Sequence, residues 1–208
     1  GAKASRAQGI ANVARVVASV KVPVIGLVKS YTSDSDVYIT PTVEDVLALE
    51  KAGAHIVAVD ATQRSRNGGV SLEEFFTNVR KVSRIPLLAD VDSLDNAINA
   101  EALGFEAIAT TLNGYTDIPS TGLPNLDLVT EISKVIKVPL IAEGGFGETA
   151  ARSVATIMDE TNESDYQHIF CPVGTGATYL GLCDASQTSK IHGILTLNNL
   201  EEIKSNSI

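Results

Sequence analysis

Short apolar runs, each followed by a polar or charged residue, recur along the 208-residue chain. Five of them read PVIGLV, HIVAV, PLLA, EAIA and PLIA, and a helix-like segment follows each one. The residues that end these runs are Lys29, Asp60, Asp90, Thr110 with Thr111, and Glu143. Because continuous apolar runs separated by helices are typical of parallel strands buried on both faces, the pattern predicts a parallel α/β fold with its polar groups on one rim.

Eight strand-like runs, most of them apolar, predict eight strands, whose starts are spaced by about 20 to 30 residues, the length of a strand plus a crossover helix. The predicted strands cover residues 2–7, 23–29, 55–61, 85–91, 106–111, 138–143, 167–173 and 190–197. Eight units favour a closed (β/α)₈ barrel of the TIM type, because closure leaves no edge strand exposed. An open parallel α/β sheet is the alternative, because the first run is short and polar. The length predicts a single α/β domain over residues 1–208.

Helix signals lie between the predicted strands. Thr42, Ser71 and Ser93 each precede an amphipathic segment and are suited to cap its first turn. Gly53 and Gly104 end two of these segments, as glycines commonly do. Each predicted helix would cover the sheet with one apolar face.

Composition excludes several functional classes. The formal net charge is −9 and no basic stripe is present, which argues against a nucleic-acid partner. No apolar run approaches the roughly 20 residues that span a bilayer, and no targeting pattern is seen, so a cytoplasmic protein without a membrane partner is expected. His55, His168 and His192 belong to separate strands, so no metal site is expected.

Lys29 and Glu143 are the candidate catalytic residues. A lysine at a barrel mouth can donate or accept a proton or form a Schiff base, whereas the alternative is an ion pair with Asp60 or Asp90. Glu143 precedes two glycines and is the matching carboxylate; alternatively it only accepts bonds from backbone donors. Asp60 and Asp90 are expected to orient groups or to accept bonds from substrate hydroxyls, because nothing near them in sequence would raise their pKa.

Two further segments point to an anionic substrate. Arg64 and Arg66 follow the third strand closely, and they either clamp an anion or lie in a solvated loop. Residues 172–182, PVGTGATYLGL, pass from a strand into a helix through small residues, which is the geometry of a phosphate cradle; a plain tight turn is the alternative. The backbone groups of this cradle belong to Gly174, Thr175, Gly176, Ala177 and Thr178.

Residues 2–144 resemble the N-acetylmannosamine-6-phosphate 2-epimerase family in the motifs PVIGLVK, SDVYITPT, IVAVDATQRSR, LLADV, LGFEAIATTLNGYT and VPLIAEG. The resemblance implies a (β/α)₈ enzyme that interconverts N-acylmannosamine 6-phosphate and N-acylglucosamine 6-phosphate without a cofactor, with Lys29 and Glu143 as its acid-base pair. It implies substrate-contacting or pocket-lining roles for Arg6, Asp60, Arg66, Asp90, Thr111 and Tyr115. The substrate phosphate would lie near Gly144, Gly145 and the turn at 174–178.

The sequence departs from the family pattern at Ser30 and Gly145, where an arginine is usual, and the family's N-terminal glutamine motif is not found. In the C-terminal part of the chain, the stretches EGGFGETAARSV, which begins at Glu143, HIFCPVGTGATYLGL and KIHGILTLNN resemble pyridoxal-phosphate-dependent D-cysteine desulfhydrases and aminocyclopropane-carboxylate deaminases, without their Schiff-base lysine motif.

Two partial resemblances in one chain predict a hybrid, with six epimerase-like units completed by two units of another α/β fold. Such an engineered scaffold would have weak or no epimerase activity and would still bind a phosphorylated amino sugar, phosphate or sulfate. The alternatives are an active natural epimerase and, more remotely, a pyridoxal-phosphate-binding protein.

Overall fold

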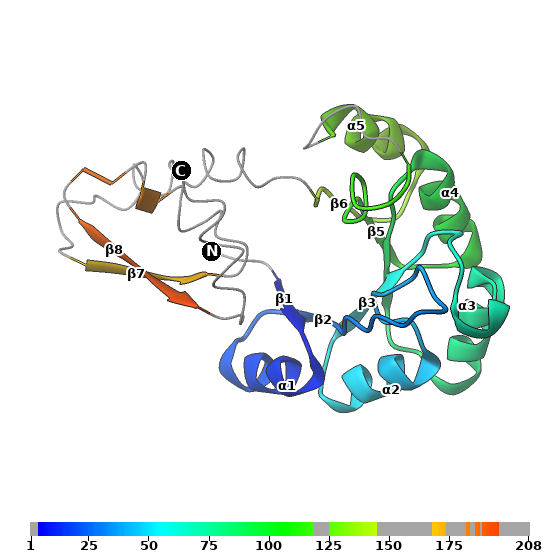
Figure 1. Ribbon diagram of the computed structural model, residues 1–208, viewed down its shortest axis with the longest axis horizontal. Helices are drawn as coiled ribbons and strands as arrows, with labels where there is room; N and C mark the ends of the chain where they lie inside the picture. Colours follow the sequence, from blue (N-terminus) through cyan, green and yellow to red (C-terminus); the bar gives the residue numbers. More distant parts are fainter. Residues whose placement is uncertain are drawn as a thin grey trace. The chain divides into compact units, whose positions relative to one another are not determined.

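The computed structural model describes residues 4–118, 125–144, 168–173, 182–183, 186–187 and 189–195. Contacts divide the chain into two compact units, Gly1–Glu143 and Gly144–Ile208. The first unit holds a six-stranded sheet and its covering helices, and the second holds a two-stranded sheet (Figure 1).

All eight predicted strands form, and all but the first lie within their predicted ranges; the first extends to Gln8, one residue past the predicted range 2–7. The strands of the first sheet are β1 (Ser5–Gln8), β2 (Val24–Leu27), β3 (Ile56–Asp60), β4 (Leu87–Asp90), β5 (Ala107–Ala109) and β6 (Leu140–Ile141). They lie in chain order and every neighbouring pair is parallel. In the second unit β7 (His168–Val173) pairs in parallel with β8 (Lys190–Leu195).

The six-stranded parallel sheet confirms a parallel α/β fold of the TIM-like kind. Among the described residues the strands form two sheets, six strands in one and two in the other. The predicted eight-unit composition is therefore not confirmed.

Three of the described helices begin directly after the predicted capping residues. Their bounds are α1 (Ile10–Ser19), α2 (Val43–Lys51), α3 (Leu72–Val82), α4 (Leu94–Leu103) and α5 (Leu126–Val135), with a short 3₁₀ turn, η1, at Asn67–Gly69. The side chains of Thr42, Ser71 and Ser93 each accept a hydrogen bond from the backbone N–H three residues ahead. Gly104 ends α4 with a φ of 102°, which glycine adopts without strain. None of the described helices is both long and apolar enough to cross a membrane.

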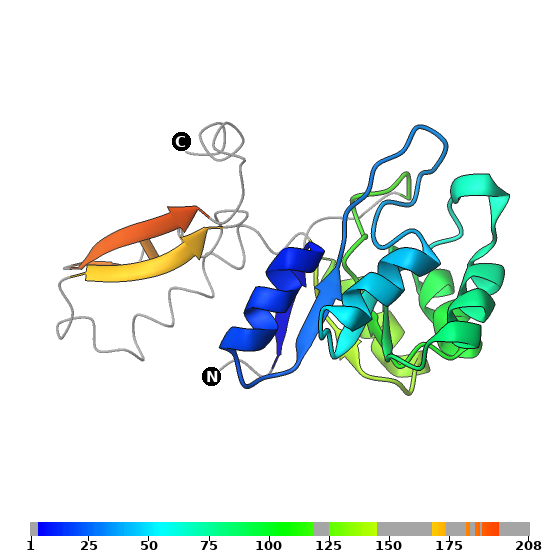
Figure 2. The same cartoon turned by 90° about the horizontal axis from the view of Figure 1, so that it is seen from below.

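Alternate residues of the strands face two different apolar layers. The outer layer lies between the sheet and the helices and includes Val57, Val59, Leu87, Ala89 and Ile108. The inner layer includes Ile25, Leu27, Ala58, Leu88 and Ala109. Figure 2 shows α1, in dark blue, lying along the first two strands. Because the strands are covered on both faces, they read in the sequence as continuous apolar runs.

Gly26 lies where α1 and α2 come closest to β2. A Cβ atom at this position would lie 3.0 Å from the Cβ of Ala54 and 3.3 Å from both Leu49 Cδ2 and Val13 Cγ2. We expect Gly26→Ala to lower the free energy of unfolding by about 1–3 kcal/mol, because the packed helices must move to admit a methyl group. Urea denaturation followed by circular dichroism measures the change, and an unaltered midpoint would contradict the close packing.

One contact between side chains shows that the six-stranded sheet is strongly curved. Arg6 on β1 lies 2.7 Å from Glu143, which follows β6. In a flat sheet five strand spacings would separate these strands by about 24 Å, far beyond the reach of an arginine. The six strands therefore curve so that the first and the last face each other across the inner side of the sheet.

Candidate functional site

Polar groups gather at the carboxyl ends of the strands, as the sequence predicts. Asp60 and Asp90 are the last residues of β3 and β4 and lie opposite each other in the register. Thr110 and Thr111 directly follow β5, while Lys29 and Glu143 come two residues after β2 and β6. Since the strands are parallel, these residues lie at the same edge of one sheet.

Arg6 connects three strands across the inner face. Its Nη2 lies 2.6 Å from Asp90 Oδ2, and its Nη1 lies 3.1 Å from Asp90 Oδ1 and 2.7 Å from Glu143 Oε2. The Asp90 side chain is fully buried, whereas that of Glu143 is 36% exposed. The two-pronged contact with Asp90 fixes the plane of the guanidinium group and aims it at Glu143.

Burial shapes the ionisation of this pair. Desolvation raises the pKa of Asp90, and the attraction of Arg6 only partly offsets the increase. Burial lowers the pKa of Arg6, but Asp90 and Glu143 outweigh it, so the net pKa of Arg6 is raised. Burial raises the pKa of Asp60 as well, so both values are raised by the tertiary structure and not by residues nearby in sequence. Burial of these carboxylates depends on how the sheet packs, so it cannot be predicted from the residues next to them in the sequence.

Two threonines hold Glu143 in place. Thr110 Oγ1 donates to the carbonyl oxygen of Glu143 at 2.7 Å and accepts from its backbone N–H at 3.0 Å. Thr111 Oγ1 lies 2.7 Å from Asp90 Oδ1 and 3.1 Å from Glu143 Oε2. A hydroxyl has one proton, so Thr111 can donate to only one of the two carboxylates at a time. The backbone of Glu143 is thus fixed, while its carboxylate keeps exposed surface.

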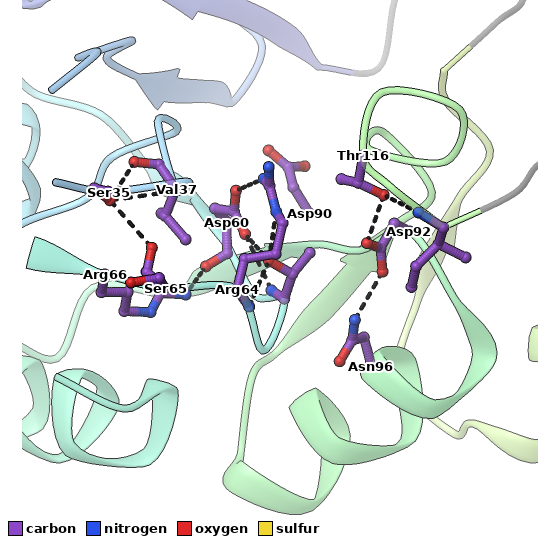
Figure 3. A network of polar contacts seen from close by, with 12 residues as sticks. Ser35, Val37, Asp60, Arg64, Ser65, Arg66, Asp90, Asp92, Asn96 and Thr116 are labelled. Atoms are coloured by element: carbon purple, nitrogen blue, oxygen red, sulfur yellow. Dashed lines mark hydrogen bonds and ion pairs between the residues drawn. The ribbon is translucent and has the colours of Figure 1, made fainter. Parts of the chain in front are cut away.

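Asp60 is bound by residues of the loop that follows β3. Arg64 Nη2 pairs with Asp60 Oδ2 at 2.5 Å, and Thr62 donates to Oδ1 through both its hydroxyl and its backbone N–H. Arg66 donates to the Asp60 carbonyl oxygen and stacks over Phe75. Figure 3 shows Arg64 and Arg66 converging on Asp60 beside Asp90. Both arginines are bound to Asp60, and the Asp60 carboxylate is occupied by protein donors.

Lys29 is exposed and makes no ion pair within the described part of the chain. The alternative expectation for this lysine, an ion pair with Asp60 or Asp90, is wrong, because Arg64 and Arg6 hold those carboxylates. The Lys29 backbone forms an antiparallel bridge with Ile39.

The remaining predicted residues are placed in part. The side chain of Tyr115 is 57% exposed in the loop after β5. Gly144 has a φ of 87° and belongs to the second unit. Gly145 and the predicted cradle at 174–178 lie outside the described residues. No group of three or more potential metal ligands occurs in the ranges that the structure describes.

Sequence reasoning missed a second buried network at the end of β4. Asp92 accepts from Asn96 Nδ2 at 2.7 Å and from Thr116 Oγ1 at 2.8 Å, and its carbonyl oxygen accepts from Asn113 (Figure 3 shows the first two). These bonds tie the loop after β5 to the start of α4. The second aspartate in the strand-ending segment ADVD was the available signal, because a polar residue beside a buried strand end usually has a partner.

Comparison with known proteins gives a consistent result. A family model described as “Putative N-acetylmannosamine-6-phosphate epimerase” matches residues 1–160. A relative from Caldanaerobacter subterraneus subsp. tengcongensis, named “Putative N-acetylmannosamine-6-phosphate 2-epimerase”, is 40% identical over 146 residues, which are 69% of this chain and 62% of the relative. A relative of the same name from Clostridium perfringens strain SM101 is 37% identical over 145 residues, 69% of this chain and 65% of the relative. The chain therefore spans less than two thirds of the length of these relatives.

A solved structure of the N-acetylmannosamine-6-phosphate 2-epimerase from Clostridium perfringens aligns with 93% of this chain and 72% of its own chain. The TM-score is 0.64 and the sequence identity is 29%. The family match also continues to residue 160, past the predicted junction after Gly144. These matches give no support to the pyridoxal-enzyme resemblance or to a hybrid origin, and a chain of natural origin fits them better.

Proposed function

The chain belongs to the N-acetylmannosamine-6-phosphate epimerase family, and from this membership we propose that it interconverts N-acylmannosamine 6-phosphate and N-acylglucosamine 6-phosphate. The two sugars differ only in configuration at C2. That carbon is next to the carbonyl group of the open-chain sugar, so its proton is acidic enough to be removed and returned. We therefore propose an active natural epimerase and not an inactive hybrid scaffold.

Lys29 and Glu143 are the proposed proton carriers. Inversion at C2 needs one group to remove the proton from one face and another to deliver a proton to the opposite face. In one direction the Glu143 carboxylate takes the proton from C2, the electron pair moves onto the carbonyl oxygen, and the Lys29 ammonium then protonates C2 from the other side. In the reverse direction the two groups exchange tasks.

The observation that supports this assignment most is the anchoring of Glu143. Its backbone is bound twice by Thr110, and its Oε2 lies 2.7 Å from Arg6, yet its side chain keeps 36% of its surface exposed. A carboxylate that is fixed but accessible is suited to repeated proton transfer, because little reorganisation is needed at each turnover.

Other rim residues would hold the sugar. Arg6 and Thr111 flank Glu143 and are proposed to contact the substrate near C2, and Tyr115 offers an exposed ring in the adjacent loop. We propose Gly144, the residue after Glu143, as a contact of the substrate phosphate. The proposed site uses no cofactor.

Isotope exchange tests the proposed function. N-Acetylmannosamine 6-phosphate is incubated with the 208-residue chain in D₂O, and the C2 proton is followed by NMR. We expect the C2 proton to be lost while N-acetylglucosamine 6-phosphate accumulates with deuterium at C2. Unphosphorylated N-acetylmannosamine is the matched control and should react far more slowly. The proposal is rejected if, over many hours at high protein concentration, the C2 proton does not exchange and no product forms.

A further inference from the structure

The backbone of Lys29 is set by a segment of the following loop. Residues Tyr38–Thr40, called the 38–40 segment below, lie between the extension of β2 and the end of β3. The Ser30 N–H donates to the Tyr38 carbonyl at 2.9 Å, and the Thr40 N–H donates to the Val28 carbonyl at 2.9 Å. These two bonds flank Lys29 on either side, so its position follows that of the segment.

The other side of the 38–40 segment is bonded to β3. The Asp60 N–H donates to the Ile39 carbonyl at 3.0 Å. The described pairing of β2 with β3 stops at Gly26 and Val57, which leaves room for the segment above it. The segment therefore separates the two strands at the rim and replaces β3 as the partner of Lys29.

Thr40 has a backbone conformation that threonine rarely adopts. Its φ is 46°, and it is the one non-glycine residue with positive φ in the described ranges. It is also fully buried. A β-branched side chain in this left-handed region is a true outlier, and such residues persist only where the surrounding structure holds them. Glycine would adopt the same φ freely, so the threonine side chain must contribute something that glycine lacks.

That contribution is a hydrogen-bond acceptor for the end of β2. Thr40 Oγ1 accepts from the Val28 N–H at 3.3 Å, while the Thr40 N–H binds the Val28 carbonyl. Both backbone groups of Val28, the residue just before Lys29, are thereby satisfied by one residue. Without the hydroxyl, this donor would lie at a partly buried position without its partner.

A second set of bonds fixes the far end of the same loop. The Asp36 and Val37 N–H groups donate to the Ser65 carbonyl at 2.9 and 3.3 Å. Ser35 Oγ donates to it as well at 3.3 Å, and Figure 3 shows Ser35 beside Ser65. The arginines on either side of Ser65 are both bound to Asp60. The loop is thus bonded to β3 at Ile39 and to the segment after β3 at Ser65, and the position of Lys29 follows that of the loop.

We propose that Thr40 is a positioning residue that places the Lys29 ammonium for proton transfer. The inference rests on the proposed function, because it assigns Lys29 a task in the reaction. Arg6 and Asp90 lie on other strands and Thr111 follows β5, so loss of the Thr40 hydroxyl should disturb proton transfer and leave sugar binding nearly intact.

The test compares Thr40→Val, which removes the hydroxyl and keeps the branched shape, with Thr40→Ser, which keeps the hydroxyl. Lysines are ¹³C-dimethylated, and the Lys29 resonance is assigned by its absence in Lys29→Arg. In Thr40→Val we expect the Lys29 resonance to move while the other lysine resonances stay in place. With unmodified protein we expect kcat to fall by about 100-fold and KM to change by less than about threefold, because displacement of a reacting group by about 1 Å has this effect. Thr40→Ser should match the wild type in both measurements.

An unmoved Lys29 resonance together with an unchanged kcat in Thr40→Val would overturn the proposal. If Thr40→Val does not give a folded amide spectrum, Thr40→Gly replaces it, since glycine accepts the positive φ and lacks the hydroxyl; the same two outcomes then decide. A wild-type chain without turnover would count against the proposed function alone, because the Lys29 resonance reports placement without substrate.

Discussion

Lys29→Met and Glu143→Gln are each expected to lower kcat for epimerisation by about 1,000-fold, the range in which a positioned acid or base contributes. Methionine keeps much of the length of lysine but carries no proton to transfer. Glutamine can still accept a bond from Arg6, so the variant retains the contact at Oε2 and loses only the basic group. Initial rates with each of the two sugar phosphates measure the effect.

Matched controls use residues of the same type away from the rim. Lys51→Met at the end of α2 and Glu131→Gln on α5 change exposed side chains and should leave kcat within about twofold, as expected for surface substitutions. If the two rim variants retain rates close to those of these controls, the proton carriers lie elsewhere. Loss of deuterium exchange at C2 in only one direction of reaction in each variant would support separate tasks for Lys29 and Glu143.

Arg6→Met is expected to lower the free energy of unfolding by about 3–5 kcal/mol at neutral pH, because it leaves the fully buried Asp90 carboxylate without its cationic partner. Thr111 alone would remain to bind Asp90 Oδ1. Urea denaturation of wild type and variant, followed by circular dichroism, gives the difference. The double variant Arg6→Met/Asp90→Asn carries neither charge and should recover part of the loss.

The loss in Arg6→Met should depend on pH in a defined direction. Burial already raises the pKa of Asp90 in the folded protein, and removal of Arg6 takes away the attraction that holds it down. The folded variant therefore binds a proton at Asp90 at higher pH than the unfolded chain does. Its stability falls as pH rises through that window and is recovered as pH falls below the folded pKa. A loss of the same size at acid and neutral pH would contradict an uncompensated carboxylate as its cause.

Local sequence signals predicted the elements of the fold well. Strands buried on both faces give unbroken apolar runs, as in β2, β3 and β4, whereas the first strand, Ser5–Gln8, is polar. Thr42, Ser71 and Ser93 cap helices as predicted, because capping depends on residues only three positions apart. The assembly of strands into one closed barrel was not confirmed, because closure depends on the sum of many small inter-strand rotations and no single segment encodes it.

The sequence predicted which residues lie at the candidate site better than it predicted which of them bond to one another. A polar residue at the end of each apolar run is enough to place Asp60, Asp90 and Glu143 on one rim. Thr40 carries no sequence signal of its own, because its positive φ is imposed by bonds to Val28 and by the burial of the loop.

By itself the sequence determined which segments form strands and helices, and which polar residues reach the carboxyl ends of the strands. These properties depend on neighbours within a few positions along the chain. Only the tertiary structure decided that Arg6 pairs with Asp90 and Glu143, 84 and 137 positions away. Those partners meet because the sheet curves over six strands, and that curvature also buries Asp90 and raises its pKa.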